Sequence, residues 1–478
     1  KGSWVLQMLR SQLGEELYRR CIKTYLERYK FQNVVTENLS SVIEEVSGRS
    51  FDQFFDQWVY HAHYPELEAA YSWDAETKLA KISIKQIQKI SEDVFLFNFP
   101  MTVRFNGKSG KVDKEFQVKE REEDFYFPLA EAPESVCLDP KMALLAKIKF
   151  TLPNAMLYAL LADQETLPGR LFAIEQLAEK KDGETLKQLA RTLENDPFYG
   201  MHIEAAKALQ KIHSDEALSA LLAAQQKSSG AGVPPASIDA RVRNQLAASI
   251  GAFYSTNAFS RAEQNILSEK NPEIRAQWIR DLGNFPKAEA QTVLLPLLET
   301  DSYRNILTDA TIAAMRAQDD PVFIDPIRKT LEQRETNFTS RGFAAALDTL
   351  GYLTRHETKR DSTREFLLSH VNDKKQTVQL GAIAALGTLE DPKATAVLEN
   401  FANMARENPE RKAAEKSLAA IRAAGRPTDN LKALSEEILG LKNESRETKK
   451  ELDALKKKLE DAPKKPEIKP ASPSRRKK

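Results

Sequence analysis

The sequence predicts a multidomain α+β protein: a short helical segment, an antiparallel β-sandwich, an α-solenoid of stacked helix pairs and a C-terminal coiled-coil helix, in that order. The first observation is length, because 478 residues correspond to about two to four domains. The second is that the hydrophobic pattern changes near residues 63 and 152. The third is a heptad pattern near the C-terminus. The predicted segments are 1–62, 63–151, 152–424, 425–461 and 462–478.

The composition argues against several classes of protein. The formal net charge of +1 gives the chain no overall field that favours nucleic acid or an anionic membrane, so no nucleic-acid partner is expected. No apolar run approaches the ~18 residues that a membrane-spanning helix needs. Cys21 and Cys137 are too few for a disulfide framework or a cysteine-based zinc site. The compartment stays open, with the cytoplasm favoured.

Residues 1–62 are predicted to form four short helices. Apolar residues recur there at intervals of three and four, and Gly14 and Gly48 interrupt the pattern. The fourth helix carries an aromatic face of Phe51, Phe54, Phe55 and Trp58. Four short helices in so short a segment are typical of the edge of a larger helical bundle rather than of an independent domain.

A series of short motifs occurs in residues 1–68: Lys1-Gly2, Leu13-Gly14-Glu15, Tyr25, Thr36-Glu37, Ser47-Gly48, Phe54-Phe55, Trp58 and Tyr64-Pro65. In this order and spacing they resemble the end of the catalytic domain of the M1 zinc metallopeptidases, the gluzincin aminopeptidases. The family commonly has a glycine two residues before that proline, where this chain has His63. By this resemblance, residues 1–62 are the helical remnant of a catalytic domain.

The resemblance also implies where the zinc chemistry of the family lies. In M1 enzymes, Lys-Gly ends a Tyr-Glu-Lys-Gly motif whose tyrosine stabilises the oxyanion of the tetrahedral intermediate. The zinc motif H-E-x-x-H lies further upstream. This chain begins one residue after the glutamate of the first motif. We therefore expect an N-terminally truncated sequence whose intact parent binds zinc and hydrolyses peptides from their N-termini, whereas this chain binds no zinc and is inactive alone.

The histidines agree with this expectation. H-E-x-x-H needs two histidines four residues apart so that both imidazoles reach one metal ion. The six histidines include no such pair: His61, His63, His202, His213, His356 and His370. The first two are interpreted as exposed loop residues at a domain junction. We therefore assign no catalytic, cofactor-binding or metal-binding residue in this chain.

Residues 63–151 are predicted to form an antiparallel β-sandwich. Short apolar or alternating segments, such as LAKISIKQI and VFLFNFPMTVRF, are separated by polar turns. Asn106-Gly107 followed by Lys108-Ser109-Gly110 predicts a hairpin turn. Six alternating aromatic residues are interpreted as core rather than as a carbohydrate-binding surface: Phe95, Phe97, Phe99, Phe105, Phe125 and Phe127. The M1 resemblance extends here, because many of those enzymes carry a β-sandwich after the catalytic domain.

Residues 152–424 are predicted to form an α-solenoid. Ala-rich helix centres recur, and the last strong apolar residues of these centres are Leu177, Leu209, Ile250, Leu282, Met315, Leu350, Leu386 and Leu418. They are spaced by 32, 41, 32, 33, 35, 36 and 32 residues, which is the period of stacked helix pairs. The pattern resembles HEAT-type repeats, and in some M1 enzymes such a domain limits substrate access. A protein partner could bind the concave surface, while the scattered arginines (Arg241, Arg243, Arg275, Arg280, Arg341 and Arg355) are interpreted as solvated or in salt bridges.

Residues 425–461 carry a heptad seam and residues 462–478 a basic tail. The seam positions are Leu431, Leu434, Ile438, Leu441, Ser445, Thr448, Leu452, Leu455 and Leu459. Coiled-coil self-association and docking of a single helix onto the solenoid both fit this pattern. The Pro-rich, basic tail is predicted to be disordered, and an inert solubilising role is favoured over weak electrostatic adhesion to nucleic acid or acidic lipid.

Two functions remain for the whole chain. The first is the C-terminal fragment of a zinc-dependent M1 aminopeptidase whose parent acts on peptide substrates. The second is a non-enzymatic, HEAT-repeat interaction scaffold that shares the aminopeptidase-like fold. An intact zinc motif in the parent would favour the first function, and a degraded motif the second.

Overall fold

The computed structural model describes residues 1–229, 239–424 and 448 and divides the chain into two compact units, Lys1–Gln318 and Asp319–Lys478. The division falls inside the predicted solenoid. The predicted domain boundaries are not tested by this division and stay predictions. The coiled-coil segment 425–461 and the tail 462–478 lie outside the described residues, apart from Thr448.

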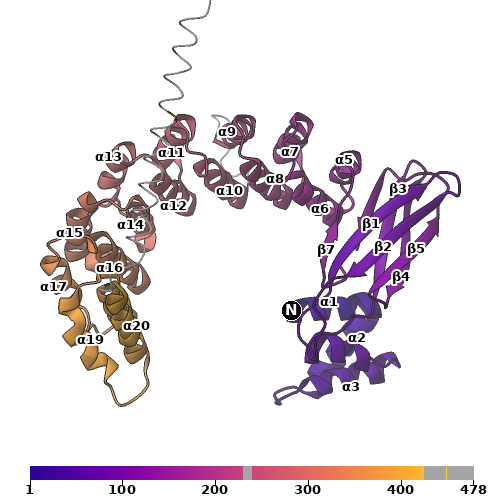
Figure 1. Cartoon of the computed structure of the whole chain (residues 1–478), viewed down its shortest axis with the longest axis horizontal. Coiled ribbons are helices and arrows are strands. Elements are labelled where there is room, and N and C mark those ends of the chain that lie inside the picture. The colour runs from indigo at the N-terminus through magenta and orange to yellow at the C-terminus, as the bar shows by residue number, and fades with distance from the viewer. Residues whose placement is uncertain (230–238, 425–447, 449–478) are drawn as a thin grey trace, which may run out of the picture. The chain divides into compact units, whose positions relative to one another are not determined.

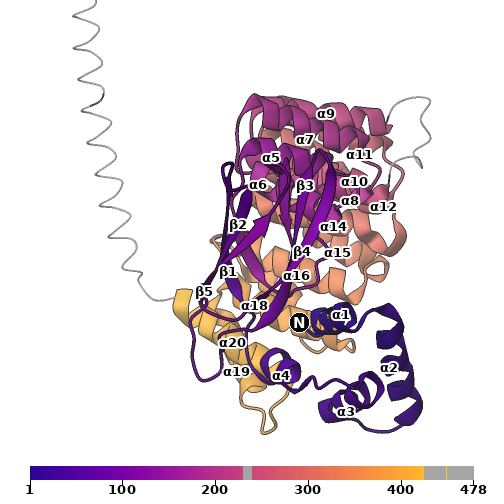
Figure 2. The ribbon, with the colours of Figure 1, turned by 90° about the vertical axis from the view of Figure 1, so that its right-hand side faces the viewer.

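The first unit begins with the four predicted helices. They are α1 (Gly2–Leu13), α2 (Glu15–Arg28), α3 (Thr36–Ser47) and α4 (Asp52–Phe55). A π-helical turn, Asp56–Tyr60, continues α4 directly. Both views place these helices at one end of the strands that follow (Figures 1 and 2). They are positioned there by the aromatic face of the fourth helix, since Phe51, Phe54, Phe55 and Trp58 are all buried.

The strands form two sheets. The elements are β1 (Glu66–Asp74), β2 (Leu79–Gln86), β3 (Phe99–Gly107), β4 (Gly110–Val118), β5 (Glu122–Pro128), β6 (Ser135–Leu138) and β7 (Lys147–Phe150). One sheet has the order β5-β2-β1-β7 and the other β4-β3-β6. Gly107 pairs with Gly110 across the predicted hairpin turn. One part of the antiparallel prediction is wrong, because β7 pairs with β1 in parallel. An alternating pattern shows which face of a strand is buried but not which way the neighbouring strand runs.

Phenylalanine rings from the two sheets meet in a common core. Phe116 of β4 lies 4.4 Å from Phe125 and 5.8 Å from Phe127 of β5, and Phe105 of β3 lies 5.5 Å from Phe127, measured between ring centroids. All six phenylalanines that the sequence assigns to the core are buried or half-buried. The core interpretation is therefore confirmed.

The predicted strand VFLFNFPMTVRF is only partly a strand. It pairs from Phe99 onward, whereas residues 95–98 belong to no strand and lack a neighbouring strand. Three buried glutamine side chains, Gln57, Gln86 and Gln88, take the place of that strand. We call them the glutamine clamp. The alternation of phenylalanines predicts strand conformation, but it cannot show which groups satisfy the backbone.

The clamp satisfies most backbone polar groups of residues 95–98. Gln86 accepts a hydrogen bond from the Phe97 amide (3.0 Å) and donates one to the Phe97 carbonyl (2.8 Å). Gln57 makes the same pair of bonds with the amide (3.0 Å) and carbonyl (2.8 Å) of Asn98. Gln88 donates to the Phe95 carbonyl (3.2 Å) and to the side-chain oxygen of Gln86 (2.9 Å). Because unpaired buried backbone groups are costly, these side chains are needed for the segment to be buried.

Residues 95–98, which we call the clamped segment, join the helices to the sheets. Gln57 comes from the π-helical turn, whereas Gln86 ends β2. The side chain of Phe97 packs against Trp58, with ring centroids 5.1 Å apart, and Phe95 packs against His61 at 3.9 Å. Backbone and side chains of one short segment therefore hold both parts together.

Helix pairs complete the first unit. They are α5 (Asn154–Ala162), α6 (Leu167–Leu177), α7 (Gly183–Asn195), α8 (Tyr199–Ile212), α9 (Asp215–Ser229), α10 (Ala240–Gly251), α11 (Thr256–Ser268), α12 (Pro272–Asp281), α13 (Lys287–Leu297) and α14 (Ile306–Gln318). Short 3-10 turns are Leu282–Asn284 and Tyr303–Asn305. The even-numbered helices follow one another in contact from α6 to α14.

The second unit continues the pattern. Its helices are α15 (Ile324–Arg334), α16 (Ser340–Thr354), α17 (Asp361–Ser369), α18 (Gln376–Leu389), α19 (Thr395–Ala402) and α20 (Pro409–Ala424), with 3-10 turns Pro321–Phe323, Glu335–Asn337 and Pro392–Ala394. All eight predicted anchor residues, from Leu177 to Leu418, are buried on the even-numbered helices or, for Leu282, just after one. The predicted repeat is therefore confirmed. Within the described residues, none of the helices combines the length and hydrophobicity needed to span a bilayer.

Three of the scattered arginines form ion pairs. Arg243 pairs with Glu269 at 2.6 Å, Arg355 with Asp319 at 2.8 Å and Arg241 with Asp239 at 2.7 Å. The first of these pairs is largely buried and links α10 to the loop after α11. These arginines therefore stabilise turns and helix contacts.

Asp281 is a buried acid where α10 and α12 approach closely. A Cβ atom added to Gly251 would lie 2.4 Å from its Cγ, so only glycine fits on α10. Gln277 donates a hydrogen bond to Oδ1 (2.9 Å), and Oδ2 has no partner within the described residues. Burial raises the pKa of Asp281 to about 7. The folded state therefore favours the protonated acid, and the stability of this unit falls as pH rises from ~4 through ~7.

We expect Gln86→Leu to destabilise the first unit by about 3 kcal/mol, because two backbone groups of Phe97 lose their partners in a buried place. Urea unfolding followed by tryptophan fluorescence measures the change. Gln264→Leu, at an exposed position of α11, is the control and should change stability by less than about 0.5 kcal/mol. Equal stability of Gln86→Leu and the wild type would contradict the role of the clamp.

We expect Asp281→Asn to stabilise the first unit at pH 8 by about 2 kcal/mol and to have little effect at pH 4, because it removes the buried charge. Urea unfolding at both pH values tests this. Glu263→Gln, on the exposed face of α11, serves as the control and should leave the pH dependence unchanged. An Asp281→Asn variant that keeps the wild-type pH dependence would show that another group titrates.

Candidate functional site

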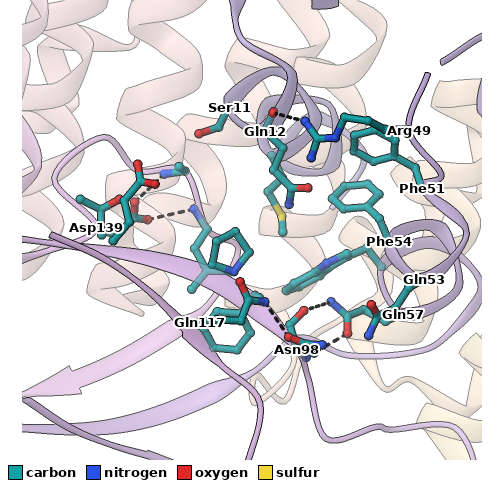
Figure 3. A pocket seen from close by; sticks show the side chains of 18 of the residues that line it. Ser11, Gln12, Arg49, Phe51, Gln53, Phe54, Gln57, Asn98, Gln117 and Asp139 are labelled. Carbon is teal, nitrogen blue, oxygen red and sulfur yellow. Dashed lines mark hydrogen bonds between the residues drawn. The ribbon is translucent and has the colours of Figure 1, made fainter. Parts of the chain in front are cut away.

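A polar groove lies where the helices meet the sheets, and we call it the junction groove. Its volume is about 470 Å³, within the range of small-molecule sites. It is lined by Met8, Ser11, Gln12, Arg49, Ser50, Phe51, Gln53, Phe54, Gln57, Trp58, Asn98, Phe99, Pro100, Thr102, Glu115, Gln117, Asp139, Ala143 and Leu144 (Figure 3). The groove therefore depends directly on the clamped segment, which supplies Asn98.

Side-chain amides dominate its polar lining. Gln12 comes from α1, Gln53 from α4 and Gln117 from β4. Gln117 donates a hydrogen bond to the side-chain oxygen of Asn98 (2.6 Å). Gln57 is committed to the backbone of Asn98, so it forms part of the wall rather than a free recognition group.

The groove carries two charged side chains without ion pairs. Arg49 donates a hydrogen bond to the Gln12 carbonyl (3.2 Å), and its guanidinium lies 5.3 Å from the ring centroid of Phe51. Neither Arg49 nor Glu115 forms an ion pair within the part of the chain that the structure describes. Both remain available to a ligand.

Asp139 lines the groove but has a structural task. Its carboxylate accepts hydrogen bonds from the amides of Ala143 (2.7 Å) and Leu144 (2.9 Å), which closes the turn before β7. Burial raises the pKa of Asp139 above its ordinary value, while these two bonds oppose that shift. The carboxylate therefore shapes one wall of the groove.

The π-helical turn positions the remaining wall. Such turns are rare and often occur at functional sites. Here the turn places Gln57 and Trp58 next to each other in the buried junction, where the first binds backbone and the second packs on Phe97. The wall is therefore held by packing and by hydrogen bonds.

The two histidines singled out in the sequence occupy different environments. The Nδ1 atom of His61 lies 3.0 Å from the Asp56 carbonyl, and its ring packs on Phe95, so this residue is part of the junction. His63 is exposed and has a positive φ of 66°. Among residues 1–229 and 239–424, no group of three His, Cys, Asp or Glu side chains could hold a metal ion. These residues do not fit a zinc centre.

Sequence reasoning assigned no site residue and missed the junction groove. Its lining comes from distant segments, from Met8 of α1 to Leu144, which is 136 positions further along the chain. No motif links them. The amides and unpaired charges are suited to binding a polar ligand, and the groove offers hydrogen bonds rather than an activated nucleophile.

Two parts of the chain match known families. Residues 1–58 match the peptidase family M1 domain, and residues 324–419 match HEAT repeats. The first match coincides with the helices that precede the clamped segment. The second lies in the second unit.

Relatives that match this chain include aminopeptidases. The chain is 35% identical over 69 residues to aminopeptidase N of Lactococcus lactis subsp. lactis, which is 14% of this chain and 8% of that protein. It is 24% identical over 168 residues to the puromycin-sensitive aminopeptidase of Caenorhabditis elegans, which is 34% of this chain and 17% of that protein. The chain thus spans less than a fifth of the length of these relatives.

A solved structure shows a similar fold over more of the chain. Aminopeptidase A of Legionella pneumophila, in complex with aspartic acid, superposes with a TM-score of 0.56 at 14% identity, covering 87% of this chain and 56% of that one. This supports an aminopeptidase-like fold beyond residue 58. The predicted resemblance is confirmed: residues 1–58 match the peptidase M1 domain, and residues 324–419 of the same chain match HEAT repeats.

Proposed function

We propose that this chain is the C-terminal part of a zinc-dependent M1 aminopeptidase. The observation that carries the proposal is the M1 match of residues 1–58, directly followed by two sheets and helix pairs that also resemble an aminopeptidase structure. The similarity to the worm relative extends over 168 residues, which is longer than the M1 match alone. Peptides are then the substrate class.

The zinc chemistry of such an enzyme requires residues beyond those described here. The described histidines and carboxylates do not come together as a metal site, and a catalytic zinc usually has three protein ligands. We therefore expect residues 1–478 alone not to hydrolyse peptides. Their role is to complete and support the catalytic domain.

An apolar surface on the first helices supports contact with the rest of an M1 domain. Leu26, near the end of α2, is 62% exposed, and Phe31 and Val35, in the loop between α2 and α3, are 97% and 62% exposed. Large apolar side chains gathered at one place commonly mark an interface. We propose that this surface packs against the zinc-binding part of an M1 catalytic domain.

The remaining segments follow as parts of the same proposal. Residues 63–151 act as a β-sandwich that braces the helices, residues 152–424 act as a repeat domain that shapes access to the substrate, and residues 425–461 dock or self-associate. The clamp supports the bracing role, since it links the helices to β2. The alternative, an interaction scaffold, is favoured by the HEAT match alone.

We expect the native protein, purified from its source cells with an antibody against residues 63–151, to release N-terminal amino acids from aminoacyl-coumarin substrates. The activity should be lost on chelation and restored by zinc. Recombinant residues 1–478 should be inactive under the same conditions.

The control is the same purification with antibody that has first been saturated with recombinant residues 63–151. Native protein that is pure but inactive with zinc present would contradict the peptidase proposal and favour the scaffold. Activity of recombinant residues 1–478 would contradict the proposal that the zinc ligands lie elsewhere.

A further inference from the structure

We propose that the junction groove binds short peptides in their zwitterionic form, with the C-terminal carboxylate at Arg49 and the N-terminal ammonium at Glu115. This goes beyond the proposed function, because the groove is built entirely from described residues of this chain and contains no catalytic group. Binding here depends on neither zinc nor hydrolysis.

Arg49 points to a carboxylate. A guanidinium presents five N–H donors in a planar fork that matches carboxylate geometry. The side chain of Arg49 forms one hydrogen bond within the described residues, to the Gln12 carbonyl, and no acidic side chain there pairs with it. The ring of Phe51 lies against the guanidinium and limits its orientation. The remaining N–H donors of the Arg49 guanidinium can therefore form two parallel hydrogen bonds with a ligand carboxylate.

Glu115 supplies the opposite charge on the other wall. Residues 115 and 117 lie two apart on β4, so their side chains share one face of the strand. Figure 3 draws Gln117 and Asn98 across the groove from Arg49 and Gln12. A ligand that crosses the groove thus meets a cation at one wall and an anion at the other. A peptide carries complementary charges at its two ends.

Amides between these charges suit a peptide backbone. The clamp shows how this chain uses glutamine, because Gln57 accepts from the amide of Asn98 and donates to its carbonyl. Gln12 and Gln53 line the same groove, and in the described residues neither side-chain amide forms a hydrogen bond with another residue. Each can make the same pair of bonds with a bound peptide.

The walls are preorganised. Trp58 is 1% exposed and packs on Phe97, and Asn98 is fixed by both Gln57 and Gln117. Fixed walls reduce the ordering cost of binding. A volume of about 470 Å³ limits the ligand to a short peptide or the end of a longer one.

The test measures binding of trialanine and trialanine amide to the full chain by calorimetry. We expect saturable binding of trialanine and about tenfold weaker binding of the amide, because amidation removes the carboxylate that pairs with Arg49. In Arg49→Gln, amidation should cost less than about twofold, since the two changes remove the same interaction. N-acetyl-trialanine should also bind more weakly than trialanine, because acetylation removes the ammonium that pairs with Glu115.

The matched control is Arg20→Gln, at an exposed position of α2 that does not line the groove. It should bind both peptides as the wild type does. Unchanged thermal unfolding of Arg49→Gln confirms that the groove is intact, and Arg49→Lys should retain part of the preference for the carboxylate. Absence of saturable binding, equal binding of trialanine and its amide, or an undiminished effect of amidation in Arg49→Gln would overturn the proposal.

These outcomes are independent of the proposed peptidase function. Peptide binding by the recombinant chain requires no activity, and activity of the native protein requires no binding in the groove. Failure of one proposal therefore leaves the other standing.

Discussion

The pairing of glutamine side chains with the backbone of residues 95–98 is the constraint on which the first unit depends. An extended segment buried without a neighbouring strand has unpaired amides and carbonyls, which is costly in a folded protein. Gln57, Gln86 and Gln88 provide the partners. Because these side chains come from both the π-helical turn and the end of β2, satisfying the backbone also joins the first four helices to the sheets.

The same junction creates the candidate site. Asn98 is held by Gln57 on one side and by Gln117 on the other, and its neighbours form the floor of the junction groove. Glutamine and asparagine side chains have two roles at this junction: some hold the structure together, and others line the groove. The buried amides of Gln57, Gln86 and Gln88 bind backbone groups and one another, whereas the side-chain amides of Gln12 and Gln53 remain open to a ligand. The groove is thus a consequence of how the helical segment is attached.

Much of the fold follows from local patterns, but the junction does not. Three-and-four spacing predicts the first helices, Asn106-Gly107 predicts the hairpin, and the period of anchors such as Leu177 predicts the helix pairs, because each signal lies within a short window. The alternating phenylalanines of residues 95–98 look like part of a paired strand, because side chains can alternate between a buried and an exposed face whether or not a neighbouring strand is present. The clamp, the parallel pairing of β7 and the groove depend on contacts between distant segments, which no local pattern encodes.

Hydrogen–deuterium exchange of the recombinant chain in increasing denaturant tests the central claim most directly. If the clamp joins the helices to the sheets, the amides of Phe97 and Asn98 should be protected like those of β2, and residues 50–60 should lose protection in the same step. The matched comparison is α2, whose side chains are mostly exposed and which should open at lower denaturant. Free exchange of residues 50–60 and 95–98 while β2 and β3 stay protected would contradict the account.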